Sequence, residues 1–289
     1  MSLLQILILA AVQGLAELLP VSSSAHVVVA EKLMGLDPSS PEMTLLLVML
    51  HTGTMFAVIL YFWKQWHKTF FRSTQAFKRA AFLLILATII TGVIGEGLVK
   101  VIEKTLFRHA EHAEIEQLFS HLELIAPALA AAGILILIAG LREKQPVAAN
   151  ADDDSALDVT RAGIIGAVQG LCLPFRGFSR SGATISAGML AGVPKLSAER
   201  FSFALAVILT PPVIAREVLR LVKANHISVG LHLASAMGPG ILGAFCSFLA
   251  GLLALKWLSQ WLEKGRWYLF GIYCLVAAGV VMYLHHHGY

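Results

Sequence analysis

Two short stretches of this sequence place acidic, basic and hydroxyl side chains inside otherwise apolar surroundings. One runs from Gln13 to His26, and the other runs from Gln169 to Thr184. Ionisable groups in apolar membrane segments are energetically costly, so their presence there indicates function. These two stretches therefore carry the candidate chemistry of the protein.

The first stretch contains a carboxylate, a histidine and a run of serines. Gln13 and Glu17 are four residues apart, so they share one face if this segment is helical. Pro20 should end or kink that helix, and His26 can begin a returning helix. The turn between them contains three hydroxyl groups, those of Ser22, Ser23 and Ser24. The pattern predicts that a hydroxyl, an imidazole and a carboxylate lie close together, as nucleophilic catalysis requires.

The second stretch is suited to binding an oxyanion. Arg180 offers a planar fork of donors that matches phosphate oxygens. Gly177 and Gly182 allow the backbone to approach a ligand closely. The N-terminus of a half-helix in this stretch would add backbone N–H groups. Further hydroxyl donors come from Ser179, Ser181 and Thr184.

Simpler interpretations compete with the functional ones at several positions. For Ser22 and Ser24, the simpler interpretation is that they cap the half-helices and have no other role. A lone glutamine or glutamate can hold helices together. Arg176 can reach the membrane interface instead of the site. His51, in the segment His-Thr-Gly-Thr, either faces the cavity or is a packed histidine.

The composition identifies the environment in which these motifs lie. Of the 289 residues, 57% are hydrophobic and only 14% are charged, and the mean hydropathy is +0.75. Soluble domains carry roughly 25% charged residues. The sequence thus predicts an all-α polytopic membrane protein with the lipid bilayer as its solvent. The net charge of +4 fits basic cytoplasmic loops, and we expect no nucleic-acid partner.

Six stretches are long enough to span a bilayer, and two apolar regions are too short and are broken by polar residues, Gly and Pro. The broken regions cover residues 3–34 and 163–193 and are predicted to be re-entrant hairpins, each of two half-helices. The predicted spans are Thr44 to Trp63, Ala80 to Ile102, Leu122 to Leu141, Ser202 to Val222, Val229 to Leu255 and Trp267 to Leu284.

The two broken regions are related in sequence. The segment Ala-Val-Gln-Gly-Leu at residues 11–15 recurs at residues 167–171, an offset of 156, and Ser23 falls on Ser179 at the same offset. Each hairpin is followed by three spans. Because an odd number of spans separates them, the two units should have inverted topology, with a site at their interface.

This repeat divides the chain into two units within a single membrane domain. The first repeat is predicted at residues 1–141 and the second at residues 162–289, with a cytoplasmic linker at 142–161. The loop at 64–79 holds five basic residues and no acid, which predicts a cytoplasmic location. Both termini are then expected on the periplasmic side.

The two motifs together resemble those of undecaprenyl-diphosphate phosphatases of the bacitracin-resistance type. The resemblance also includes the segment at 51–54, Asp158 and the segment at 201–203. In one respect the sequence departs from the family, which usually has proline at the position of Arg176. The residues that carry the resemblance are Gln13, Glu17, the run Pro-Val-Ser-Ser-Ser-Ala-His that ends at His26, and the run Gly-Phe-Ser-Arg-Ser-Gly-Ala-Thr from Gly177 to Thr184.

The resemblance implies an enzyme of the bacterial inner membrane that hydrolyses undecaprenyl diphosphate to the monophosphate. This reaction recycles the lipid carrier of peptidoglycan synthesis and confers bacitracin resistance. The family's activity is supported by a divalent cation, Mg or Ca, for which Gln13 and Glu17 are the candidate ligands. The sequence leaves a homodimer open.

The motifs suggest a mechanism in which Ser23 attacks the terminal phosphorus and either His26 or Glu17 accepts its proton. Arg180 would neutralise the developing charge on the phosphoryl oxygens. Direct attack by water, with Ser23 only as a ligand, is the alternative. A lipid transporter or flippase is the rival function, because inverted repeats and broken helices are typical of transporters. The remaining substrate-binding candidates are Ser22, Gly177, Ser179, Ser181 and Thr184.

Overall fold

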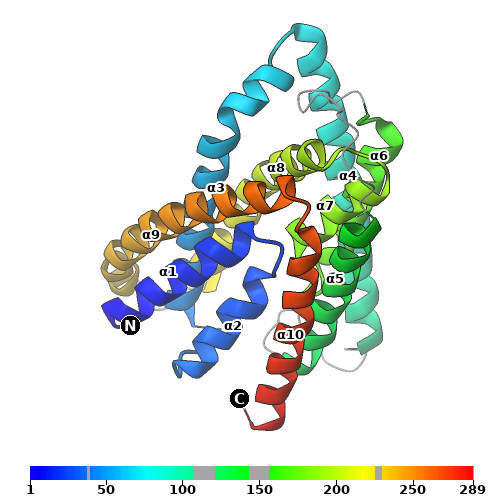
Figure 1. The fold of residues 1–289 in the computed structure, drawn as a ribbon. Helices are drawn as coiled ribbons and strands as arrows, with labels where there is room; N and C mark the ends of the chain where they lie inside the picture. The colour runs from blue at the N-terminus through cyan, green and yellow to red at the C-terminus, as the bar shows by residue number, and fades with distance from the viewer. Residues whose placement is uncertain (38–39, 107–120, 143–155, 225–229, 289) are drawn as a thin grey trace.

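The computed structural model describes residues 1–37, 40–106, 121–142, 156–224 and 230–288, and its regular structure there is entirely helical (Figure 1). The helices are α1 Leu3–Leu18, α2 Ser23–Leu33, α3 Pro41–Thr69, α4 Thr74–Leu106, α5 Leu122–Arg142, α6 Val159–Cys172, α7 Arg180–Leu190, α8 Lys195–Ala224, α9 Gly230–Glu263 and α10 Trp267–His286. Most of the predicted linker, residues 143–155, lies outside the described residues.

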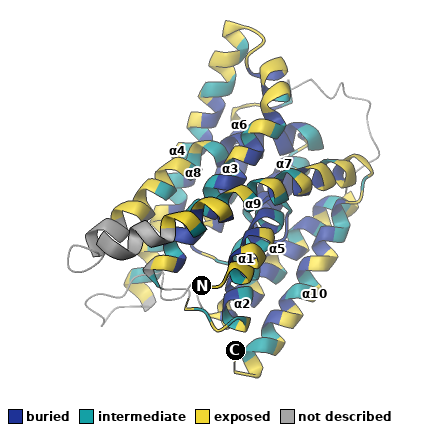
Figure 2. Cartoon of the chain, turned by 90° about the vertical axis from the view of Figure 1, so that its left-hand side faces the viewer, coloured by how far each residue is buried: buried dark blue, intermediate teal, exposed yellow. Residues whose placement is uncertain are grey.

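Within the described residues, six helices are long and apolar enough to cross a membrane, namely α3, α4, α5, α8, α9 and α10. Their outer faces expose large apolar side chains such as Leu60, Val93 and Val276, as lipid contact requires (Figure 2). The chain is therefore an all-α, multi-pass membrane protein, which confirms the predicted class. Helix α3 continues to Thr69, beyond the predicted end at Trp63. The prediction included only the apolar part of this helix.

The four remaining helices form two short hairpins, each interrupted by a sharp break. In the first, α1 ends at Leu18 and Pro20 lies in the connection. Ser22 has a positive φ of 68°, which is rare outside glycine, and its hydroxyl accepts the N–H of Ala25 at 3.5 Å. This cap makes α2 begin at Ser23. The prediction that His26 begins the returning helix is therefore wrong by one helical turn.

The second hairpin has the same construction. Asp158 caps α6 by accepting the N–H of Arg161 at 2.8 Å, so this helix begins before the predicted start at residue 163. Ser179 caps α7 by accepting the N–H of Gly182 at 3.2 Å. Arg180 is consequently the first residue of a helix, where the backbone N–H groups are not used within the helix.

Each hairpin packs its first helix against a span of the other half of the chain. Helix α1 lies on α9, and α6 lies on α4. The repeated glycines make these contacts close: a Cβ at Gly14 would lie 2.5 Å from that of Ala250, and a Cβ at Gly170 would lie 2.9 Å from that of Ile94. The repeated segment Ala-Val-Gln-Gly-Leu therefore serves helix packing as well as chemistry.

The long helices pair across the two halves as well. Helix α5 packs along α10 and α3 along α8, where the rings of Phe62 and Phe203 stack with centroids 5.2 Å apart. Both chain termini lie toward one end of the molecule, and the turn between α3 and α4 lies at the opposite end (Figure 1). The division into repeats at residues 1–141 and 162–289 stays a prediction.

Candidate active site

The tips of the two hairpins meet at the carboxylate of Glu17. The hydroxyl of Ser23 donates to Glu17 Oε2 at 2.5 Å, and Arg180 Nη2 donates to Glu17 Oε1 at 2.8 Å. The Glu17 side chain is only 16% exposed and that of Arg180 is 24% exposed. One carboxylate thus connects the hydroxyl of the first motif to the guanidinium of the second.

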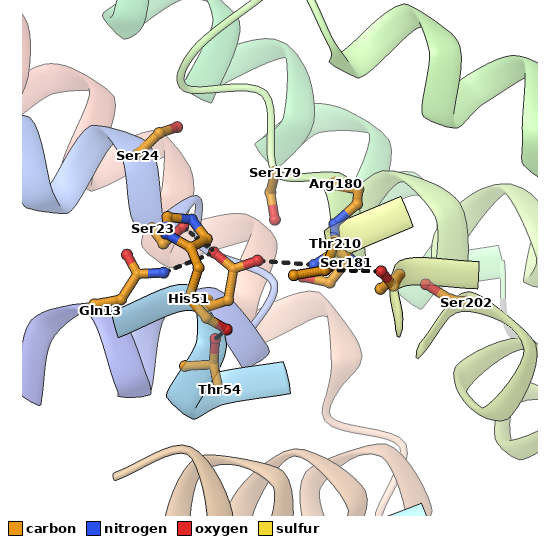
Figure 3. Close-up of polar contacts among 12 residues, drawn as sticks. Gln13, Ser23, Ser24, His51, Thr54, Ser179, Arg180, Ser181, Ser202 and Thr210 are labelled. Carbon is orange, nitrogen blue, oxygen red and sulfur yellow. Dashed lines mark hydrogen bonds and ion pairs between the residues drawn. The ribbon is translucent and has the colours of Figure 1, made fainter. Parts of the chain in front are cut away.

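Two further side chains surround the same carboxylate. Gln13 Nε2 donates to Glu17 Oε2 at 3.2 Å, one helical turn earlier on α1. His51 Nε2 lies 3.7 Å from that oxygen, and its Nδ1 lies 2.8 Å from the carbonyl oxygen of Leu47. Figure 3 shows Gln13, Ser23 and His51 on one side of the site, and Ser179, Arg180 and Ser181 on the other. Of the two interpretations of His51 that the sequence left open, the structure favours the one in which it faces the site.

One donor of Arg180 is buried and unused by the described part of the protein. Its Nη1 has no hydrogen-bond partner among the described residues, although Nη2 is paired. Leaving a buried charged donor unpaired is costly. A bound oxyanion would supply an acceptor for this donor.

The hydroxyl groups of the second motif bind the protein itself. Ser181 donates to the carbonyl oxygen of Leu19 at 3.2 Å, and Thr184 donates to that of Arg180 at 2.8 Å. Ser179 is occupied as the cap of α7. Ser181 and Thr184 would have to give up these bonds to donate to a phosphate. Ser179 only accepts as a cap, so its hydroxyl can still donate.

The backbone of the second motif contacts the serines of the first. Gly177 donates its N–H to the Ser24 hydroxyl at 3.3 Å, and the Ser22 and Ser24 hydroxyls lie 3.2 Å apart. Gly177 has a φ of 100°, and a Cβ there would lie 2.4 Å from the carbonyl oxygen of Ile125. Only glycine therefore fits this turn. The turn brings the two hairpin tips together.

The sequence matches the family of the bacitracin resistance protein BacA over residues 6–280. The chain belongs to this family. It is 58% identical over 287 residues to "Undecaprenyl-diphosphatase 2" of Acinetobacter baylyi, with 98% of each chain covered. It is 31% identical to "Undecaprenyl-diphosphatase" of Desulfosudis oleivorans, covering 97% of this chain and 98% of the relative. The corresponding protein of Desulfatibacillum aliphaticivorans is 34% identical, with 96% and 97% covered.

In this BacA family member, His26 lies outside the group around Glu17. Its Nδ1 is 2.8 Å from the carbonyl oxygen of Ser22, and its Nε2 is 2.7 Å from the hydroxyl of Tyr273. Within the described residues, the imidazole nearest to Glu17 is that of His51. Sequence reasoning missed Tyr273, because a tyrosine in the last span of a membrane protein carries no local signal of a site.

Within the part of the chain that the structure describes, the surroundings of Glu17 fit a resident Mg or Ca ion poorly. Among the described residues, no group of three or more His, Cys, Asp or Glu side chains can hold a metal ion. Glu17 already accepts hydrogen bonds at both oxygens. Such cations take six or more oxygen ligands, and Gln13 and Glu17 offer too few.

Proposed function

We propose that the chain hydrolyses undecaprenyl diphosphate to undecaprenyl phosphate and inorganic phosphate, which recycles the lipid carrier and confers resistance to bacitracin. The names of its relatives support this reaction. One observation carries the proposal for this chain. The buried Nη1 of Arg180 lacks a hydrogen-bond partner among the described residues, and the same arginine is bonded to Glu17, which accepts the hydroxyl of Ser23. A terminal phosphoryl group supplies the missing acceptor.

In the proposed reaction, Ser23 Oγ attacks the terminal phosphorus while Glu17 accepts the hydroxyl proton along the existing 2.5 Å hydrogen bond. The bond between that phosphorus and the bridging oxygen breaks, and undecaprenyl phosphate leaves with the bridging oxygen. Glu17 gives up the serine proton as undecaprenyl phosphate leaves. Water then attacks the phosphoserine while Glu17 accepts one of its protons. The bond between Ser23 Oγ and phosphorus breaks, this proton passes from Glu17 to Oγ, and phosphate is released. Direct attack by water on the substrate is the alternative, in which Ser23 stays unmodified.

Arg180 has two roles in this proposal. In the free protein it pairs with Glu17 at 2.8 Å, which favours the ionised carboxylate and makes it a weaker base. A phosphoryl group that binds the guanidinium competes with Glu17 for it. Substrate binding would therefore both neutralise phosphate charge and restore the basicity of Glu17. Gln13 keeps the carboxylate oriented by its own hydrogen bond at 3.2 Å.

We infer that a divalent cation, where the reaction needs one, is bound chiefly by the oxygens of the substrate diphosphate. The protein's donor set around Glu17 is too small for a resident site. Equilibrium dialysis of the purified protein with Ca should then show no stoichiometric binding until a diphosphate is added. Tight binding to the protein alone, abolished in Glu17→Gln, would contradict this inference.

We also propose the bacterial inner membrane as the location, with both termini in the periplasm. The basic loop at residues 64–79 supports this orientation. The first hairpin then enters from the periplasmic side and the second from the cytoplasmic side. A homodimer, which the sequence leaves open, is tested by light scattering of the detergent-purified protein.

Phosphate release from undecaprenyl or farnesyl diphosphate by the purified protein is the deciding experiment. We expect release by the wild type and its loss in Glu17→Gln and Arg180→Ala. Glu123→Gln, which changes an exposed carboxylate at the start of α5, serves as the matched control and should stay active. If the wild type moves the lipid between vesicle leaflets but releases no phosphate, the protein is a transporter and the proposal fails.

A further inference from the structure

His26 is held by two hydrogen bonds from opposite sides of its ring. Nδ1 faces the carbonyl oxygen of Ser22, which can only accept, so Nδ1 carries a proton. In the neutral imidazole Nε2 is then the unprotonated nitrogen, and the hydroxyl of Tyr273 donates to it at 2.7 Å. The two rings are nearly parallel, with an interplanar angle of 11° and centroids 5.6 Å apart.

The position of Tyr273 is fixed by close packing of its helix. A Cβ at Gly271 of α10 would lie 2.7 Å from the carbonyl oxygen of Gly133 in α5, so the two backbones are in direct contact. The next residue along α10, Cys274, places its thiol 3.3 Å from the carbonyl oxygen of Pro20. Helix α10 therefore contacts the first hairpin at two consecutive residues, Tyr273 and Cys274.

His26 in turn holds the strained residue next to the candidate nucleophile. The carbonyl oxygen of Ser22 accepts both the backbone N–H of His26 at 3.4 Å and its Nδ1–H at 2.8 Å. Ser22 has the positive φ of 68°, a conformation that costs of order 1–3 kcal/mol and persists only where its surroundings enforce it. Ser23, which donates to Glu17, follows directly.

We propose that Tyr273 is a positioning residue for phosphoryl transfer, acting through His26 to hold the turn that presents Ser23 to Glu17. This inference rests on the proposed function. Helix α10, the last helix of the second half, thereby takes part in the site formed by the first hairpin. The hydroxyl of Tyr273, rather than its ring, makes the contact with Nε2.

Loss of the Tyr273 phenol should change how the rate depends on pH. The phenol donates to unprotonated Nε2 and so stabilises the neutral imidazole. Within the described residues, the titratable group bonded to His26 is Tyr273, and no carboxylate forms an ion pair with the ring. Without the phenol, His26 binds a proton at higher pH. The added positive charge near Ser23 favours ionised Glu17 and weakens it as a proton acceptor.

The test is Tyr273→Phe in the purified, full-length protein. We expect kcat/KM to fall by about tenfold, the rate equivalent of one neutral hydrogen bond, and the acidic limb of the pH profile to move to higher pH. Tyr283→Phe removes an exposed phenol from the same helix and should leave both quantities unchanged.

A double-mutant cycle separates action through His26 from a general effect on packing. In a His26→Asn background, Tyr273→Phe should change neither the rate nor the profile further. Nitrogen NMR of the wild type with labelled histidine should show a ring protonated at Nδ1, whose Nε2 signal moves in Tyr273→Phe. Equal losses in both backgrounds, or an unchanged pH profile, would overturn the proposal. If the wild type releases no phosphate at all, the proposed function fails instead, while the NMR result still reports the contact with Tyr273.

Discussion

At the scale of single residues, the site depends on a competition for the carboxylate of Glu17. Ser23, Gln13 and Arg180 all donate to it, and the Arg180 contact is the only one that carries a full charge. A carboxylate held by a guanidinium is a poor base, because the pair favours the ionised form. In the proposed mechanism, a ligand that draws Arg180 away makes Glu17 a better acceptor for the proton of Ser23. In the free protein, Glu17 is thus expected to be a poor acceptor for the proton of Ser23.

Phosphate release should require both the charge and the planar shape of the Arg180 guanidinium. Arg180→Ala removes both donors and should lower kcat/KM by roughly 10²–10³-fold, the usual cost of losing a donor that stabilises transition-state charge. Arg180→Lys keeps the charge without the planar fork, so an intermediate loss is expected. Arg142→Ala, at the exposed end of α5, is the control for phosphate-release assays. Equal activity of the lysine variant and the wild type would contradict the need for two donors.

The serines of the first motif should differ in their contributions. Ser23→Ala removes the candidate nucleophile and should reduce phosphate release by on the order of a thousandfold or more. Ser24→Ala removes the acceptor of the Gly177 N–H and the contact with the Ser22 hydroxyl, but no group bonded to Glu17, and should cost far less. Mass spectrometry of protein quenched during turnover should find a phosphoryl group on the Ser23 peptide. Nearly full activity in Ser23→Ala would instead favour direct attack by water.

The sequence predicted which residues form the site better than it predicted their partners. Spacing placed Gln13 and Glu17 on one face of α1, and the repeat placed Arg180 opposite them, as the hydrogen bonds of Glu17 now show. It could not predict that the His26 ring turns to the Ser22 carbonyl, because side-chain direction follows from the unusual backbone of Ser22. His51 was ambiguous because a single histidine in a span fits either role.

At the scale of helices, each hairpin is held in the membrane by a glycine contact with a span of the other half. The chain order predicted the breaks because Pro20 and the serines are strong local signals. The partner spans α9 and α4 could not be predicted, since apolar spans resemble one another and the glycine alone does not identify its partner. Close backbone approach through small residues is a general means of packing membrane helices.

Gly14→Ala should therefore destabilise the protein. The added Cβ would lie 2.5 Å from the Ala250 Cβ and 2.6 Å from the carbonyl oxygen of Ser247, so the helices must separate, at a cost of about 1–3 kcal/mol. The melting temperature in detergent should fall. Gly279→Ala in α10, where a Cβ would meet nothing within 4 Å, should be neutral or slightly stabilising. Equal effects of the two substitutions would show that the α1–α9 contact is not as close as described.

At the scale of the whole molecule, the fold brings two hairpins to one site from opposite ends. In Figure 1, α1 and α2 lie toward the end of the chain termini, and α6 begins toward the end of the α3–α4 turn. The two hairpins carry unequal chemistry: the first supplies Ser23 and Glu17, and the second supplies Arg180. The catalytic arrangement exists only where they meet, so neither half of the chain should be active alone.

The orientation of the molecule in the membrane is testable with single cysteines. In a variant lacking the native Cys172, Cys246 and Cys274, Arg72→Cys places a thiol at the exposed α3–α4 turn, and Leu33→Cys places one at the exposed end of α2. Because basic loops remain in the cytoplasm, a membrane-impermeant maleimide should label position 33 in intact spheroplasts and position 72 only after lysis. The opposite pattern would reverse the topology and require the first hairpin to take its substrate from the cytoplasmic side.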